Sequence, residues 1–137
     1  MTIRGSMTLD VAGKPVTITG GPFDSIPEGA YGVCLEVAAA KAGQADVLLP
    51  TADFGLPDPA ALRDAVAKVL AQMEADPERP VHVGCRAGVG RTGLFMAALA
   101  KATGVEGDAL AHVRRHYLAR AAETPAQEAM ARGFTWP

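Results

Sequence analysis

The first half of the chain alternates short apolar runs with turn-forming residues, a pattern typical of strands. This pattern predicts strands over residues 8–11, 15–19, 31–36 and 46–49. Gly20-Gly21-Pro22 breaks the chain after the second run, and residues 37–43 form an Ala-rich connector whose state the pattern leaves open. Most of the predicted sheet therefore comes from residues before position 50.

A helical period replaces the short runs after residue 58. Apolar side chains then recur on one face: Leu62, Val66, Val69, Leu70 and Met73. Asp58 is placed to cap this helix with Pro59 at its first position, and Asp76-Pro77 ends it. A strand over residues 80–83 follows, and further helices are predicted over about 91–102, over about 108–118, and from about 124 onward.

The order of these elements predicts an α/β fold with a mainly parallel central sheet flanked by helices. At 137 residues the chain is long enough for one domain with a hydrophobic core and too short for two. We therefore expect a single domain over residues 1–137. Residues 1–6 (MTIRGS) are expected to be an irregular lead-in or an expression remnant without function.

Composition and charge narrow the class of protein. The hydrophobic fraction of 49% and the charged fraction of 20% are ordinary for a soluble globular domain. The net charge of −2 gives no chain-wide basic field for nucleic acid or an acidic membrane, and no apolar run approaches the roughly 20 residues of a membrane span. Cys34 and Cys85 do not make a disulfide framework, so we expect a cytoplasmic protein, acting as a monomer.

The stretch HVGCRAGVGRTG, residues 82–93, carries the clearest chemical signal. It lies between a predicted strand and a predicted helix start, where unpaired backbone N–H groups and the helix dipole favour an anion. A nucleotide-binding P-loop is excluded because Arg91 stands where that motif has lysine. A dinucleotide-binding fingerprint matches residues 88–93, but the sequence after it is helical and Asp108 resembles a helix cap rather than a strand-end acid.

A third motif accounts for the cysteine as well as the glycines. Residues 85–93 match CxxGxxR[ST] at every defined position, so the loop resembles the phosphate-binding loop of the cysteine-dependent protein tyrosine and dual-specificity phosphatases. The physical need is clear, because a thiol with the usual pKa of about 8.5 becomes a good nucleophile near helix-terminal amides and a cation. The alternative for Cys85 is a buried structural thiol.

The resemblance implies a role for each loop residue. Cys85 would be the nucleophile, Arg91 would hold phosphoryl oxygens, and Thr92 would donate a hydrogen bond to the sulfur. The substrate phosphate would be bound by the loop: Arg86, Ala87, Gly88, Val89, Gly90 and Arg91. The family usually has histidine directly before the nucleophile, whereas Gly84 stands there and His82 is predicted to be a strand residue.

The resemblance also implies a general acid on a separate loop. Residues 50–58 follow a predicted strand and precede a predicted helix, where the family has a proline-bounded mobile loop with this acid. Asp53, in ADFGLP, is the better match. Asp58 is the alternative, although its place before Pro59 favours a helix cap. The alternative for both residues is a solvent-exposed acid in a turn, without a catalytic role.

The resemblance extends to residues 112–127, which look like the family's late helix and an ET-x-x-Q turn. In tyrosine-specific members that glutamine positions the water that hydrolyses the cysteinyl phosphate, and Gln127 matches it. Thr124, Pro125 and Gln127 also form a capping box, and the two roles are compatible.

These residues predict a metal-independent phosphomonoester hydrolase that works through a cysteinyl-phosphate intermediate and uses no cofactor. Phosphorylated proteins are the expected substrates, as for a tyrosine or dual-specificity phosphatase. A small phosphate ester, an RNA 5′ end and a non-catalytic phosphate-binding role are the alternatives. His112 and His116 lack a third metal ligand in the sequence. Cys34 is predicted to be core, with a reversible disulfide to oxidised Cys85 as the alternative.

Overall fold

The computed structural model describes residues 2–137, which are built around a five-stranded sheet of order β1-β2-β5-β3-β4. The strands are β1 (Gly5–Val11), β2 (Lys14–Pro22), β3 (Tyr31–Cys34), β4 (Val47–Leu48) and β5 (Val81–Cys85). β1 pairs with β2 antiparallel, and the pairs β2–β5, β5–β3 and β3–β4 are parallel. The predicted α/β fold with a mainly parallel sheet is therefore confirmed.

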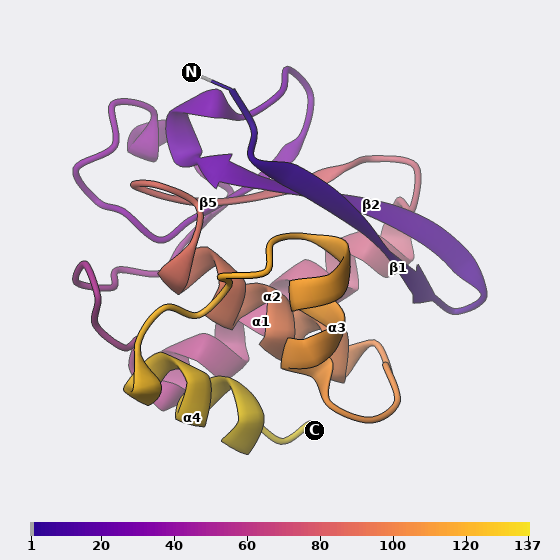
Figure 1. The fold of residues 1–137 in the computed structure, drawn as a ribbon. Coiled ribbons are helices and arrows are strands. Elements are labelled where there is room, and N and C mark those ends of the chain that lie inside the picture. Colours follow the sequence, from indigo (N-terminus) through magenta and orange to yellow (C-terminus); the bar gives the residue numbers. More distant parts are fainter. Residues whose placement is uncertain (1) are drawn as a thin grey trace.

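The helices gather on one side of this sheet, below it in Figure 1. They are α1 (Pro59–Ala75), α2 (Gly90–Ala102), α3 (Ala109–His116) and α4 (Pro125–Gly133), and two 3₁₀ turns are η1 (Phe23–Ser25) and η2 (Ala42–Gln44). The Asp58 side chain accepts a hydrogen bond from the Ala61 N–H, so the predicted cap of α1 is confirmed. No helix in residues 2–137 combines the length and the apolar character that a membrane crossing requires.

Helix α2 forms the centre of the helical layer. Every residue from Gly90 to Ala100 is buried, which suits a helix that is apolar nearly all round. It packs against β5 and against α1, α3 and α4. The first turn of α2, which contains the candidate site residues, is therefore held by the core itself.

Parallel pairing brings three strand ends to one edge of the sheet. Pro22 pairs with Cys85, and Cys34 pairs with Gly84, so β2, β3 and β5 end side by side. The loops that leave these ends, together with the loop after β4, converge on the start of α2. Ligands of open α/β sheets bind at this position, outside the carboxyl ends of the strands.

The structure corrects several predicted boundaries. Gly5 and Ser6 belong to β1 and pair with β2, so the lead-in is shorter than the predicted residues 1–6. β3 ends at Cys34 rather than at residue 36, because Glu36 turns away from the sheet to bond Arg91. The connector over residues 37–43 consists of turns and the start of η2.

Candidate active site

Cys85 is the last residue of β5 and lies beneath the loop that leads into α2. Its Sγ atom accepts two hydrogen bonds, from the Gly88 N–H at 3.2 Å and from the Thr92 hydroxyl at 3.2 Å. The residue is only 4% exposed. Two hydrogen-bond donors therefore converge on this sulfur. The spatial arrangement expected from the CxxGxxR[ST] spacing is present.

The loop needs glycine at position 88. Gly88 has φ +78°, in the left-handed region that side chains rarely adopt, and a Cβ atom there would lie 2.3 Å from Gly21 Cα. The loop therefore packs backbone to backbone against the end of β2. This close approach turns the Gly88 N–H toward the sulfur.

Arg91 is buried and fixed by the loops that follow β3 and β4. Its Nη1 donates to the Thr51 carbonyl at 2.6 Å and to a Glu36 carboxylate oxygen at 3.1 Å, while Nη2 lies 3.4 Å from an Asp53 carboxylate oxygen. Its side chain is 2% exposed. Charge-assisted bonds of this kind fix the plane of the guanidinium before any ligand arrives.

Glu36 was not singled out from the sequence, yet it orients Arg91. The Ala38 N–H donates to its other carboxylate oxygen, and this bond, followed by that from Arg91, holds the pKa of Glu36 below its usual range. It remains ionised opposite Arg91. The available signal was its place as the last residue of a predicted strand, at the end of the strand where functional side chains collect.

The structure separates the two candidate acids. Asp53 lies on the exposed loop between β4 and α1 and reaches Arg91, whereas Asp58 caps α1. The Asp53 side chain is 46% exposed, and the next residue, Phe54, is 62% exposed with φ +58°. Of the two acids, only Asp53 is therefore brought to the loop of residues 85–92, called the cysteine loop below.

Gln127 lies between α2 and the loop of residues 50–58 that carries Asp53, called the acid loop below. Its Oε1 accepts from the Glu123 and Thr124 N–H groups and its Nε2 donates to the Gly55 carbonyl at 3.2 Å. The predicted capping box with Thr124 is confirmed. A Cβ atom on Gly90 would lie 2.7 Å from Gln127 Oε1, so this buried amide also touches the start of α2.

His82 has a structural environment. It is fully buried in β5, with Nδ1 2.8 Å from the Thr19 hydroxyl and Nε2 3.2 Å from the Pro22 carbonyl. Burial lowers its pKa, so the ring is neutral at pH 7. The absence of histidine at position 84 has a steric reason, because a Cβ atom on Gly84 would lie 2.4 Å from Phe23 Cα.

Two further residues that the sequence did not indicate contact the loop backbone. The Tyr117 hydroxyl donates to the Gly88 carbonyl at 2.6 Å, and the Arg4 Nε donates to the Ala87 carbonyl at 3.1 Å. Arg4 lies outside every motif, and 83 positions separate it from its partner, whereas Tyr117 lies in the stretch over residues 112–127 without a role implied by the resemblance.

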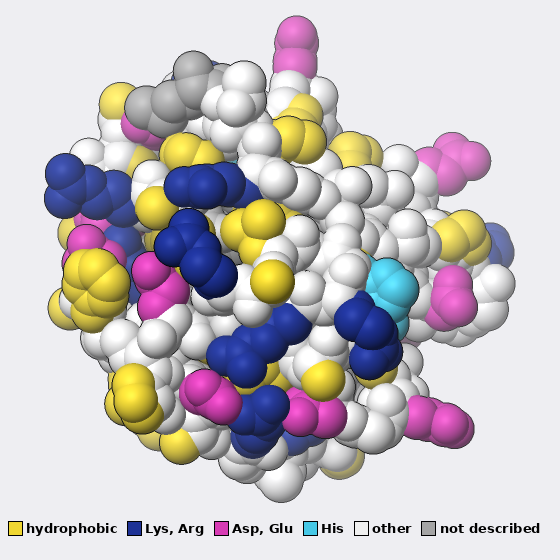
Figure 2. Space-filling view, viewed as in Figure 1, with side chains coloured by type: hydrophobic (Ala, Val, Ile, Leu, Met, Phe, Trp, Pro, Cys, Tyr) yellow, Lys and Arg dark blue, Asp and Glu magenta, His cyan; other side chains and the backbone are white. Residues whose placement is uncertain are grey.

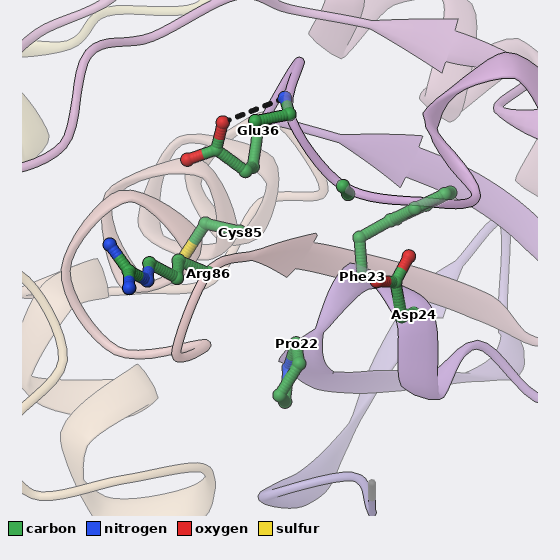
Figure 3. A pocket seen from close by; sticks show the side chains of 8 residues that line it. Pro22, Phe23, Asp24, Glu36, Cys85 and Arg86 are labelled. Atoms are coloured by element: carbon green, nitrogen blue, oxygen red, sulfur yellow. Dashed lines mark hydrogen bonds between the residues drawn. The ribbon is translucent and has the colours of Figure 1, made fainter.

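A pocket of about 300 Å³ opens beside Cys85. Its lining consists of Pro22, Phe23, Asp24, Glu36, Ala38, Ala39, Cys85 and Arg86. Figure 3 shows Cys85 and Arg86 on one side, Phe23 and Asp24 across from them, and Glu36 with its bond from the Ala38 N–H. A band of Lys and Arg side chains runs down the middle of the face drawn in Figure 2, although the net charge is −2. Basic side chains are therefore frequent on this face, with Asp and Glu side chains among them.

Metal-ligand geometry is not found in the part of the chain that the structure describes. Within residues 2–137 no three His, Cys, Asp or Glu side chains are grouped so that they could hold an ion. The rings of His112 and His116 lie 4.4 Å apart between centroids, so these two side chains pack on each other.

Comparison with solved structures shows a shared fold. A kinase-associated phosphatase whose catalytic-site cysteine is replaced by serine matches with a TM-score of 0.69 and 15% identity, over 98% of this chain and 94% of that one. Tk-PTP in its active form matches with a TM-score of 0.65 and 20% identity, over 90% and 92%. A Leishmania major protein described as a protein tyrosine phosphatase gives 0.65 and 20%, over 99% and 100%.

Comparison of sequences gives the family. No curated protein sequence matches the chain. The family model described as "Tyrosine phosphatase family" matches residues 39–133, which is more than half of the chain and includes the Cys85 loop. Since this match agrees with the shared fold and with the thiol–guanidinium loop at the strand ends, the chain belongs to the tyrosine phosphatase family and is a cysteine-based phosphatase.

Proposed function

We propose that this protein is a metal-independent phosphomonoester hydrolase of the tyrosine or dual-specificity type, with phosphorylated protein side chains as substrates. One observation carries the proposal: Cys85, Thr92, Arg91 and Asp53 meet at a single site although Asp53 is distant in sequence. This set provides a nucleophile, a sulfur-bound hydroxyl, a phosphoryl-binding cation and a proton donor. Each step of phosphoester hydrolysis then has a protein group to perform it.

In the first step the Cys85 thiolate attacks phosphorus, an S–P bond forms, and the P–O bond to the leaving group breaks. Asp53 gives a proton to the leaving oxygen. The loop amides and Arg91 stabilise the charge on the three remaining oxygens. Thr51 and Glu36 occupy Arg91 Nη1, so the phosphoryl group would be bound by the opposite edge of the guanidinium, through Nε and through Nη2, where it would replace the 3.4 Å contact with Asp53.

In the second step water attacks phosphorus and the S–P bond breaks, which releases inorganic phosphate and restores the thiolate. The Asp53 carboxylate takes the proton from the water, and the Thr92 hydroxyl stabilises the departing sulfur. Gln127 binds Gly55 in the acid loop through Nε2, which has a second hydrogen that could hold the attacking water. Its expected catalytic role is part of this proposal.

The pocket beside Cys85 supports a side-chain-sized substrate. Pro22, Phe23, Ala38 and Ala39 give it apolar walls, and Arg86 is exposed at its mouth. Such a pocket accommodates one phosphorylated side chain while the rest of a peptide stays on the surface. Small phosphate esters and RNA 5′ ends are the alternative substrates that an assay must compare.

Hydrolysis of an aryl phosphate in the presence of EDTA tests the proposal. We expect turnover that survives the chelator and falls by roughly 10⁴-fold or more with Cys85→Ser, as for loss of other enzyme nucleophiles. Cys34→Ser is the matched control and should retain activity. Phosphotyrosine and phosphoserine peptides are then compared with a sugar phosphate and a 5′-phosphorylated RNA. Hydrolysis that requires a metal ion, or that persists in Cys85→Ser, would contradict the proposed mechanism.

A further inference from the structure

Two side chains from outside the motif hold successive carbonyl groups of the cysteine loop. Arg4, just before β1, binds the Ala87 carbonyl through Nε at 3.1 Å. Tyr117, just after α3, binds the Gly88 carbonyl through its hydroxyl at 2.6 Å. The two anchors reach the loop from opposite ends of the chain, and they bind neighbouring peptide groups.

Peptide planarity converts these contacts into an orientation of the loop amides. In a trans peptide the C=O and the following N–H point in opposite directions. A bond that fixes the Ala87 carbonyl therefore also fixes the Gly88 N–H, which the structure places 3.2 Å from the Cys85 sulfur. By the same geometry, the bond to the Gly88 carbonyl makes the Val89 N–H point away from Tyr117.

Both anchors are themselves positioned by the end of β2. The Arg4 N–H donates to the Gly20 carbonyl at 2.7 Å. A Cβ atom on Gly20 would lie 2.5 Å from the Tyr117 hydroxyl oxygen, so the tyrosine occupies the space that a side chain at position 20 would need. Burial, and then the charge of Cys85, raises the pKa of Tyr117, which keeps its hydroxyl protonated and able to donate.

We infer that Arg4 and Tyr117 are positioning residues of the phosphate-binding loop, which hold its amides in the orientation that binds an oxyanion. The inference rests on the proposed function for its catalytic consequence but not for its effect on anion binding. It gives the N-terminal segment a role, whereas the sequence led us to expect none. The two bonds also explain how the loop keeps its shape although position 84, next to Cys85, has no room for a side chain that could bond the loop backbone.

Calorimetric titration with inorganic tungstate tests the inference without requiring turnover. Tyr117→Phe removes one hydroxyl and keeps the packed ring, so tungstate affinity should fall about 3–10-fold, the usual worth of one hydrogen bond. Arg4→Ala should give a loss of the same order. Arg4→Lys, which keeps the charge and a donor, should recover most of it. Kinetic assays should show kcat/KM for an aryl phosphate falling by similar factors.

The chain offers matched controls for both variants. Tyr31→Phe removes the hydroxyl of the other tyrosine, which lies on β3 next to Arg79, and Arg115→Ala removes an exposed arginine of α3. Both controls should bind tungstate as the wild type does. Unfolding midpoints measured in parallel should show that every variant is folded at the titration temperature.

The outcomes separate this inference from the proposed function. If the wild type hydrolyses phosphoesters but Tyr117→Phe and Arg4→Ala match it in affinity and kcat/KM, the inference is wrong and the proposed function stands. If the wild type binds tungstate without hydrolysing any phosphoester, the proposed function fails, and the affinities of the variants still decide the inference. Equal losses in Tyr31→Phe or Arg115→Ala would also overturn it.

Discussion

The cysteine loop and the acid loop meet at one site but are held very differently. The first, residues 85–92, is tied to the core by the sulfur bonds and by the ion pair of a buried arginine. The second, residues 50–58, exposes about half of the Asp53 side chain and most of Phe54, and is joined to the rest mainly by Arg91 and Gln127.

This difference fits the role that the proposed mechanism gives to each loop. An anion site gains from amides that are oriented before the ligand binds, because no reorganisation is then needed during the reaction. A proton donor must make room for the leaving group, and loosely held loops are suited to such movement. The comparison predicts that substitutions in the first loop slow the turnover of all substrates. Substitutions in the second loop should slow turnover by an amount that depends on the leaving group.

The largest effect is expected from Arg91→Ala. An arginine that stabilises a transferring phosphoryl group is worth about 10³–10⁵ in kcat, and we expect a loss in that range for good and poor leaving groups alike. Arg91→Lys should recover little, because an ammonium cannot bond Thr51, Glu36 and phosphate in the same plane. Steady-state kinetics with two aryl phosphates test this. A loss confined to the poorer leaving group would contradict the assigned role.

Asp53→Asn should have the next largest effect, and a selective one. General acid catalysis contributes about 10²–10⁴-fold, so turnover of an alkyl phosphate or phosphopeptide should fall by that factor, whereas an aryl phosphate with a stable phenolate should lose much less. Asp58→Asn is the matched control and should change stability and turnover little, because asparagine caps a helix about as well as aspartate does. A leaving-group-dependent loss in Asp58→Asn instead would move the acid five residues along the chain.

Gln127→Ala should show how far the acid loop depends on its contact with α4. Compared with Thr124→Ala, it loses the bond to the Gly55 carbonyl as well as part of the capping box. Both variants should lose about 1 kcal/mol of stability, but only Gln127→Ala should slow poor leaving groups, by about 3–10-fold. If the two variants turn over poor leaving groups at the same rate, Gln127 acts only as a helix cap.

The smallest effect concerns pH and stability rather than rate. Burial lowers the pKa of His82 in the folded state below its unfolded value of about 6.5, so folding favours the neutral ring. Stability from this group is present above the unfolded pKa and is lost as pH falls through 6.5 toward the folded value, at up to about 1.4 kcal/mol per pH unit. Denaturant unfolding of wild type and His82→Gln between pH 7.5 and 5 checks this. If the free energy of unfolding changes with pH as steeply in His82→Gln as in the wild type, this assignment is wrong.

The sequence was sufficient where the signal is local. The apolar spacing after Asp58, its cap and the CxxGxxR[ST] spacing each lie within a few residues, so helix α1 and the cysteine loop could be predicted with nearly correct boundaries. The same reasoning distinguished Asp53 from Asp58. Boundaries of β1, β2 and β3 were less accurate, because hydrogen-bond pairing across the sheet, and not the apolar run, decides where a strand begins and ends.

The sequence could not reveal contacts that only the folded chain creates. Glu36 meets Arg91 across 55 positions, and Arg4 and Tyr117 meet the loop across 83 and 29. Their residue types are common on any protein surface, and no spacing rule connects them. The steric reason for Gly84 likewise depends on η1 packing against β5.

The central claim is that Cys85 forms a covalent bond to phosphorus. Rapid acid quench after mixing with a ³²P-labelled aryl phosphate, followed by mass spectrometry of the peptides, measures it directly. The account predicts a phosphorylated Cys85 that forms before free phosphate is released, accumulates further in Asp53→Asn with a good leaving group, and is absent from Cys85→Ser. Label on another residue, or hydrolysis with no phosphoenzyme together with an active Cys85→Ser, would contradict it.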